Sequence, residues 1–280
     1  QQMEAFAPFP QNHSSYQQAR SGGGIIMKTL KEKIAEGKIV NGTMLRVLRN
    51  PAVAYLADQA GLDFLMFDCE HANYSLETMH DINLTARALG ISCMARVPYL
   101  REEYIGLILE AGLEGIQVPM VETAEQAAEI VRCAKFPPIG ERGFAAKTAN
   151  TCYRGIKPTE LMRADNQRVV VIAQIESKRG VENVHAIAPV DGLDCLLVGP
   201  NDLSISLGVP GDTMNPIELE AIAKVADACQ AHNKLFALHA GAGMCDLFKD
   251  QLSLNIQNFD SDFIVNGMRA IVEYGQTFRR

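Results

Sequence analysis

The feature that most constrains the fold is an alternation of short apolar runs and amphipathic segments, repeated eight times from Lys28 onward. Strands appear as continuous apolar runs when both of their faces are buried, as in a parallel sheet covered by helices. The alternation therefore predicts eight parallel strands. We expect them at Ile39–Leu45, Phe64–Phe67, Ser92–Arg96, Gly115–Val118, Val169–Ile175, Cys195–Val198, Leu235–Leu238 and Leu254–Gln257.

The segments between these runs carry signals for the ends of helices. Gly61, Gly90 and Gly112 stand where helices should stop. Thr123 with Gln126 has the spacing of a capping box, and Asn215 with Glu218 repeats it. Eight strand–helix units in 280 residues predict an α/β fold, a closed (β/α)8 (TIM) barrel with an extra N-terminal helix. An open Rossmann sheet is disfavoured because no G-x-G-x-x-G follows the first strand.

The first 26 residues differ from the rest of the chain. Residues 1–26 are rich in Gln, Ser and Asn and end in Gly22-Gly23-Gly24. Such a composition buries too little apolar surface to become ordered alone. We expect 1–26 to be a flexible extension or a cloning remnant, and 27–280 to form a single catalytic barrel domain.

Charge and composition exclude several kinds of partner. A net charge of −7 with no basic tract argues against nucleic acid and anionic membranes. The longest apolar run, Val169–Ala173, is far shorter than the roughly 20 residues that span a bilayer. We expect no signal peptide, because no basic stretch leads into an apolar one. Seven scattered cysteines without a C-x-x-C pair indicate reduced core thiols and a cytoplasmic protein.

Polar side chains gather where the expected strands end. Asp68–His71 follows the second strand, and Arg96 ends the third. Gln174–Glu176 ends the fifth strand, and Gly199–Asp202 follows the sixth. In a (β/α)8 barrel these ends converge on one mouth, where catalysis takes place. The sequence therefore predicts one site that combines His, Arg, Glu and Asp.

Glu176 and Asp202 are the carboxylates that directly end two neighbouring strands. Two oxygen ligands without a nearby His or Cys cluster suit Mg²⁺ or Mn²⁺, with water or substrate completing the coordination. The alternative is structural, with these carboxylates capping the next helix or pairing with a lysine such as Lys178.

Arg96, His71 and Arg142 each have a functional and a structural interpretation. Arg96, at the end of a buried strand, needs an anion, which is either a substrate oxygen or a carboxylate such as Glu70. His71 is either a base oriented by Asp68 or an ordinary surface or core histidine. Arg142, in the long stretch that begins at Pro137, either binds an anionic end of the substrate at the mouth or ties down its loop. Of the other histidines, His239 alone is positioned to approach the mouth.

An ordered set of short motifs resembles the HpcH/HpaI family of class II pyruvate aldolases, a set that includes keto-deoxy sugar-acid aldolases and macrophomate-synthase-like proteins. The order and spacing of the motifs match from about residue 28 to residue 278. The motifs are D-x-E-H at 68–71, A-R-V-P at 95–98, V-P-M-V at 118–121, F-P-P-x-G-E-R-G at 136–143, Q-I-E-S at 174–177 and G-P-N-D-L-S at 199–204.

The resemblance implies a role for each matching residue. Glu176 and Asp202 would hold a divalent cation, Mg²⁺ or Mn²⁺, with Co²⁺ as a further candidate. Arg96 would neutralise the enolate oxygen of pyruvate, and His71, oriented by Asp68, would relay the proton. Gln174 and the backbone of Gly199, Pro200 and Asn201 would position pyruvate, and Glu110 would reach into a neighbouring subunit's site. The family is typically a homo-oligomer, a hexamer or trimer of dimers, with an exchanged C-terminal helix, here Ser261–Phe278.

The implied reaction is the metal-dependent cleavage of a 4-hydroxy-2-oxo acid into pyruvate and an aldehyde. Breaking a carbon–carbon bond beside a ketone requires an enolate, which a divalent cation and an arginine stabilise. Oxaloacetate decarboxylation or decarboxylative condensation needs the same enolate without an aldol base. A barrel that only binds a 2-oxo acid and a lyase of CoA esters are less favoured functions for the same fold. A Schiff-base mechanism is disfavoured because Lys147 and Lys178 are expected on loops.

Three departures from the family pattern fall near the expected mouth. Cys69 replaces a glycine, Asn201 replaces an alanine, and Asn258–Asp262 stands where G-V-D-T is usual. The sequence therefore leaves the aldehyde partner undetermined.

Overall fold

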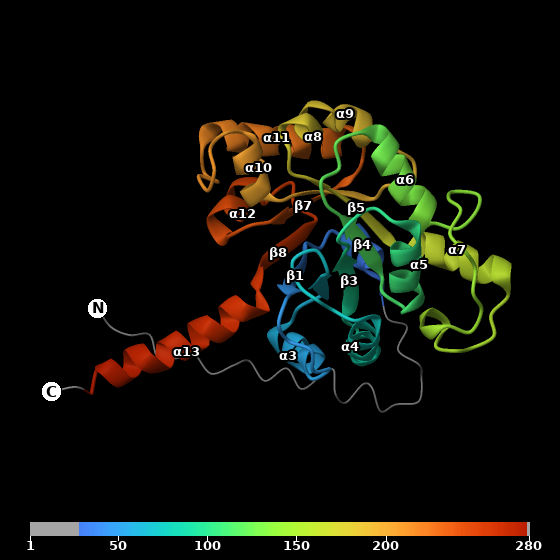
Figure 1. The fold of residues 1–280 in the computed structure, drawn as a ribbon, viewed down its shortest axis with the longest axis horizontal. Coiled ribbons are helices and arrows are strands. Elements are labelled where there is room, and N and C mark those ends of the chain that lie inside the picture. The colour runs from blue at the N-terminus through green and yellow to red at the C-terminus, as the bar shows by residue number, and fades with distance from the viewer. Residues whose placement is uncertain (1–27, 279–280) are drawn as a thin grey trace.

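The computed structural model describes residues 28–278, in which eight parallel strands form a closed barrel (Figure 1). Each strand pairs with the next in sequence, and β8 closes onto β1. The strands are β1 (Val40–Leu45), β2 (Phe64–Asp68), β3 (Ser92–Arg96), β4 (Gly115–Val118), β5 (Val170–Ile175), β6 (Cys195–Val198), β7 (Leu235–His239) and β8 (Leu254–Phe259). The expected barrel is confirmed. The largest difference is in β8, which was expected to end at Gln257 and runs to Phe259.

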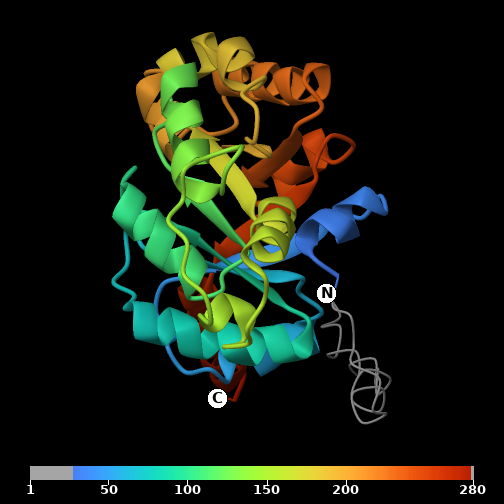
Figure 2. The same ribbon diagram turned by 90° about the vertical axis from the view of Figure 1, so that its right-hand side faces the viewer.

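Helices surround the barrel, and one projects away from it (Figures 1 and 2). They are α2 (Leu30–Ala35), α3 (Val53–Ala60), α4 (Leu76–Leu89), α5 (Glu102–Glu110), α6 (Ala124–Ala134), α7 (Pro158–Arg168), α8 (Lys178–Glu182), α9 (Val184–Ile187), α10 (Pro200–Ser206), α11 (Pro216–Ala231), α12 (Ala242–Phe248) and α13 (Asp260–Gln276), with a short 3-10 turn η1 (Ala149–Thr151). None of the helices described between residues 28 and 278 has the length and apolar character needed to cross a bilayer.

The predicted helix ends are confirmed in part. Gly61 and Gly90 end α3 and α4 in the left-handed conformation, and Thr123 with Gln126 forms a reciprocal capping box. The second expected capping box is wrong. The side chain of Asn215 accepts a hydrogen bond from the amide of Ile217, but Glu218 is buried and its carboxylate has no hydrogen-bond partner among the described residues.

Strand residues alternate between two apolar layers. One layer fills the barrel interior and includes Met44, Phe64, Met94 and Ile172. The other layer packs against the surrounding helices and includes Leu65, Ala95, Ala173 and Val198. Side chains in a strand alternate with period two. The next inward-pointing residue after the last apolar inward-pointing residue of a strand therefore lies at the mouth.

The helix α2 closes the end of the barrel where the strands begin. Leu30 is fully buried in the interior cluster, and its amide donates to Glu114 Oε1 over 2.6 Å, just ahead of β4. Lys31 pairs with Asp194 at 2.6 Å, ahead of β6. The extension at residues 1–26 lies outside the described residues.

The stretch from Pro137 to Gly143, which contains Arg142, lies at this same end of the barrel and not at the mouth of its own chain. Only residues 119–123 connect β4 to α6, and the long stretch follows α6 instead. In Figure 1 the stretch and α7 lie on the right, opposite α10 and α12, and Figure 2 looks onto that end. The amide of Phe136 donates to Asn166 Oδ1 over 2.7 Å, near the end of α7.

Candidate active site

The mouth of the barrel is a cavity of about 590 Å³ lined by strand ends and by the segments that follow them. Most of the predicted site residues line it: His71, Arg96, Gln174, Gly199, Pro200, Asn201 and Asp202. Asp68 and Glu176 are almost fully buried in its wall. The sequence therefore predicted nine residues that the fold brings together.

Arg96 is held in the wall by two carboxylates. Its Nη2 donates to Asp68 Oδ2 over 2.8 Å, its Nε donates to Asp68 Oδ1 over 3.1 Å, and its Nη1 lies 3.1 Å from Glu70 Oε2. Burial disfavours the charged form of Asp68, but the bonds from Arg96 outweigh burial and lower the pKa of this carboxyl. The structural partner considered for Arg96, Glu70, is thus present, and the guanidinium is fixed at the cavity surface.

Asp68 does not orient the ring of His71, so that expectation is wrong. Its Oδ1 accepts from the backbone amides of Glu70 and His71 over 3.2 and 3.1 Å, and its other bonds go to Arg96 and Arg46. The imidazole is exposed, and its Nε2 lies 3.8 Å from Glu70 Oε2, beyond hydrogen-bonding distance. The β2–α4 turn therefore places the ring at the cavity through its backbone.

Glu176 lies at the end of a chain of side-chain hydrogen bonds. Gln117 Nε2 donates to Gln174 Oε1 over 2.5 Å, and Gln174 Nε2 donates to Glu176 Oε2. The amide of Met120 donates to Glu176 Oε1 over 2.8 Å. Met120 has a φ of 55°, a conformation that is uncommon for a residue with a side chain and that turns its amide toward the carboxylate.

The surroundings of Glu176 favour a cation. Burial raises the pKa of Glu176 to about 7, and the nearby charges of Glu70 and Asp202 add to the rise, against the bond from Met120. Asp202, in the first turn of α10, lines the cavity, and Lys178 lies near Glu182 and not near either carboxylate. Within residues 28–278 no group of three or more His, Cys, Asp and Glu has the arrangement of a metal site. Two carboxylates alone, Glu176 and Asp202, would leave a hard cation to complete its coordination with water or substrate.

His239 also lines the mouth, as its position after the seventh strand indicated. Its ring packs against Phe259 with centroids 4.9 Å apart. Desolvation, together with the charges of Arg96 and Arg46, lowers the pKa of His239 to about 4. The imidazole is therefore neutral at pH 7.

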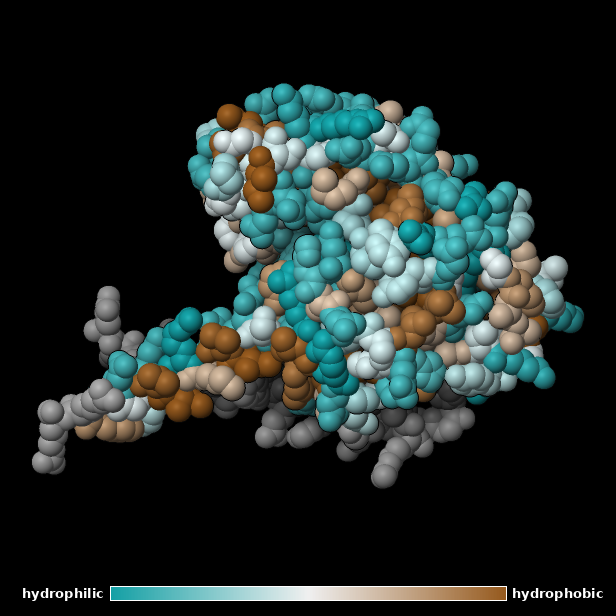
Figure 3. All heavy atoms as spheres, in the orientation of Figure 1, coloured by the Kyte–Doolittle hydropathy of each residue, from teal (hydrophilic) through white to brown (hydrophobic). Residues whose placement is uncertain are grey.

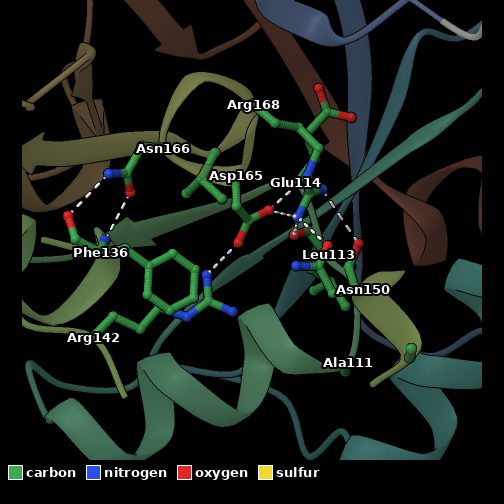
Figure 4. Close-up of polar contacts among 12 residues, drawn as sticks. Ala111, Leu113, Glu114, Phe136, Arg142, Asn150, Asp165, Asn166 and Arg168 are labelled. Atoms are coloured by element: carbon green, nitrogen blue, oxygen red, sulfur yellow. Dashed lines mark hydrogen bonds and ion pairs between the residues drawn. The ribbon is translucent and has the colours of Figure 1, made fainter. Parts of the chain in front are cut away.

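Arg142 lies away from the mouth of its own chain, at which it was predicted to bind substrate. It lies at the other end of the barrel, where its Nη1 donates to Asp165 Oδ2 over 2.6 Å (Figure 4). Its guanidinium also lies over the ring of Phe136, 4.6 Å from the centroid. The structural interpretation holds: a buried ion pair ties the loop after α6 to α7.

Glu110 is the last residue of α5 and is partly exposed. Helices that follow barrel strands run antiparallel to them, so this end of α5 lies away from the mouth of its own chain. Glu110 therefore does not reach the mouth of its own chain.

Three groups at the site were missed: Arg46, Gln117 and the backbone amide of Met120. Arg46 stands two residues after the interior residue Met44, and Gln117 stands two residues after Gly115. The period of two, followed within the fourth run and one step past the end of the first, would have found both side chains. No local signal indicates the positive φ of Met120.

A closed parallel barrel with two carboxylates, a buried arginine and an imidazole at the carboxyl ends of its strands defines a (β/α)8 enzyme site. The sequence pattern described as HpcH/HpaI aldolase/citrate lyase matches residues 44–243. The chain belongs to this family, as its motifs predicted.

Named relatives and a solved structure agree with this assignment. The chain is 34% identical over 209 residues to the hydroxypyruvate/pyruvate aldolase of Roseobacter denitrificans, covering 73% of this chain and 81% of the relative. It is 36% identical over 207 residues to the 4-hydroxy-2-oxovalerate aldolase of Novosphingobium aromaticivorans, covering 71% and 76%. The HpcH/HpaI aldolase of Desulfitobacterium hafniense superposes with a TM-score of 0.86 at 30% identity, covering 90% and 98%.

Proposed function

We propose that this protein is a divalent-metal-dependent aldolase that cleaves a 4-hydroxy-2-oxo acid into pyruvate and an aldehyde. The observation that supports it most directly is that Asp202 and Arg96 line one cavity and that both lie close enough to the buried Glu176 for their charges to act on it. Two relatives named as aldolases of hydroxy-oxo acids or pyruvate favour the same reaction type.

Glu176 and Asp202 would hold the cation, which we expect to be Mg²⁺ or Mn²⁺, with Co²⁺ as a further candidate. Both oxygens of Glu176 keep a free lone pair, since each accepts one hydrogen bond within the described chain. When bound, the cation supplies Lewis-acid polarisation of the keto acid.

The chain's own residues position the acid and handle the proton. Gln174 and the backbone of Gly199, Pro200 and Asn201 form the wall beside Glu176, where they would orient pyruvate. Arg96, fixed by Asp68 and Glu70, would neutralise negative charge on the keto oxygen as the bond breaks. His71 would accept the proton of the C4 hydroxyl, because its ring lies at the cavity and is accessible. Glu110 would act in the site of a neighbouring subunit.

Removing either metal-binding carboxylate tests the proposal. Glu176→Gln and Asp202→Asn should each abolish pyruvate release that Mn²⁺ stimulates, and EDTA should abolish it in the wild type. Glu182→Gln, an exposed carboxylate of α8, is the matched control and should keep full activity. Full metal-stimulated activity in either Glu176→Gln or Asp202→Asn would refute the proposal.

Oxaloacetate decarboxylation is the second candidate, because it needs the same enolate and no aldol base. His71→Ala separates the two reactions. Aldol cleavage should fall by about two orders of magnitude, whereas decarboxylation should survive. A barrel that only binds a 2-oxo acid would release no pyruvate from any hydroxy-oxo acid and would turn over no oxaloacetate, with or without EDTA.

We further propose a homo-oligomer, a hexamer or trimer of dimers, in which α13 is exchanged between subunits. Figure 1 shows α13 projecting from the barrel, and Figure 3 shows apolar side chains along it. Phe263, Met268, Ile271 and Tyr274 are each at least half exposed. A helix with such an apolar stripe is stable in water when a partner covers it.

We also propose that the protein is cytoplasmic. All seven cysteines are free thiols, and six of them are buried, which suits a reducing compartment. We propose that 27–280 is the catalytic unit and that residues 1–26 are dispensable.

A further inference from the structure

Arg46 is a second cation at the mouth, and its outer nitrogens are not engaged. It follows β1, and its Nε donates to Asp68 Oδ2 over 2.7 Å. Within the described chain neither Nη of Arg46 donates a hydrogen bond, and the residue lines the cavity. A guanidinium offers a planar fork of donors that matches a carboxylate.

The position of this fork is fixed from three sides. The guanidinium carbon lies 3.5 Å from the centroid of the Phe259 ring, which sets the plane of the group. Asp68 holds Nε, and Asp260 accepts from the backbone amides of Arg46, Val47 and Leu48 over 2.7–2.9 Å. A side chain held in this way loses little conformational entropy when it binds an anion.

The cavity has room for a substrate longer than pyruvate. The two carboxylates expected to hold the cation come from the β5 and β6 side, whereas Arg46 and Phe259 come from the β1 and β8 side. In the closed order of eight strands β1 lies across the barrel from β5, and β3, which ends in Arg96, lies between them. A volume of about 590 Å³ is in the usual range for pockets that enclose a whole small ligand.

We propose that Arg46 binds a carboxylate on the aldehyde half of the substrate, so that the preferred substrates are 4-hydroxy-2-oxo diacids. This inference rests on the proposed aldolase function and specifies its substrate class. Pyruvate would occupy the Glu176 side, and the far carboxylate would meet the two Nη groups of Arg46. The neutral ring of His239 lies in the same wall and adds no competing charge. The carboxylate of Asp262 also lines this side, but it accepts from the amide of Phe259 over 3.0 Å at the start of α13.

The test compares substrates that differ in this one charge. Pyruvate release is measured from two diacids, 4-hydroxy-2-oxoglutarate and 4-hydroxy-2-oxoheptanedioate. It is also measured from 4-hydroxy-2-oxovalerate, which has no second carboxylate. The quantity is the ratio of kcat/KM for the better diacid to kcat/KM for the valerate. A ratio is used because Arg46 also bonds to Asp68, which in turn holds Arg96. A fall in kcat/KM that is the same for all substrates would therefore report on a disturbed Arg96 and not on binding of the far carboxylate.

The wild type should prefer the better diacid, and Arg46→Gln should lower the ratio by about 10- to 100-fold, as expected for the loss of a charge-assisted hydrogen bond. Arg46→Lys keeps the charge without the planar fork of donors, and its ratio should lie between those of the wild type and Arg46→Gln. Arg49→Gln is the matched control, since Arg49 is an exposed arginine of the same β1–α3 connection and lies over Tyr74; it should keep the wild-type ratio.

Deuterium exchange of the pyruvate methyl protons, followed by NMR with Mn²⁺ removed before measurement, separates the two proposals. Exchange requires the enolate but no aldehyde. If the wild type shows neither exchange nor pyruvate release, the aldolase function is refuted and this inference with it. If exchange occurs and Arg46→Gln and Arg46→Lys leave the ratio unchanged, only the role of Arg46 is refuted. Loss of exchange in both variants would place Arg46 at the enolate and overturn the inference as well.

Discussion

At the scale of single residues, the site depends on how closely neighbouring groups approach. Gly199 shows this: a Cβ built on it would lie 2.5 Å from Gln174 Nε2 and 2.8 Å from Glu176 Oε2. Gly199→Ala must therefore displace the hydrogen-bonded pair that positions the Glu176 carboxylate. We expect metal-stimulated pyruvate release to fall by about two orders of magnitude. Gly106→Ala, in α5 with open space around its Cβ, is the control, and equal activity in the two variants would contradict this account.

Residue identity was predictable at the mouth, but side-chain orientation was not. The sequence placed Asp68 and His71 three residues apart, which fits an oriented imidazole as well as it fits a carboxylate that caps a turn. The two guanidiniums of Arg46 and Arg96 decide between these, because they occupy the oxygens of Asp68. Arg46 comes from a strand distant in sequence, so no local pattern around Asp68 could reveal it.

At the scale of elements, a buried ion pair helps to hold the loop after α6 against α7. Arg142 and Asp165 are each less than 5% exposed, and Arg168 also donates to Asp165 (Figure 4). Arg142→Met leaves Asp165 with one partner and should lower the free energy of unfolding by about 3–5 kcal/mol. Denaturant unfolding measures this, and kcat/KM at a temperature where the variant is folded should match the wild type. A fall in kcat/KM in the folded variant would instead indicate that Arg142 has a role at an active site.

The first turn of α11 has a pH-sensitive carboxyl. Glu218 is fully buried without a hydrogen-bond partner among the described residues, and desolvation, with Asp212, raises its pKa to about 7. The folded state therefore binds this proton more tightly than the unfolded state does. The resulting stability is complete below about pH 4.5 and is lost as the pH rises through about 7.

Glu218→Gln should accordingly raise the Tm by about 2–4 °C at pH 8, with a gain that shrinks toward pH 5. Thermal unfolding across this pH range measures the difference. Asp227→Asn, an exposed carboxylate of the same helix, should show no such pH-dependent gain. A gain for Glu218→Gln that is equal at pH 5 and pH 8 would rule out its titration as the cause.

At the scale of the whole molecule, α13 connects the mouth to the surface between subunits. Asp260 begins this helix and accepts from the backbone amide of Arg46, directly after β1, while residues 265–276 of the helix are exposed. The double variant Met268→Lys/Ile271→Lys should convert the oligomer into smaller species, as measured by light scattering after size exclusion. Asn266→Lys/Gln276→Lys adds the same charge to the polar face and should leave the oligomer intact. Identical masses for the two double variants would refute the exchange of α13.

The sequence by itself determined the number of strands, their parallel order and most residues of the mouth. These follow from repeating local signals, namely apolar runs, helix caps and polar residues at strand ends. The tertiary structure alone decided that Pro137–Gly143 lies at the far end of the barrel, since that depends on α6 starting directly after β4. It also decided that Asp68 serves two arginines and that Arg46 keeps two nitrogens free. Such contacts join residues that follow different strands. Whether they form depends on how the strands pack in the barrel and not on the local order of residues along the chain.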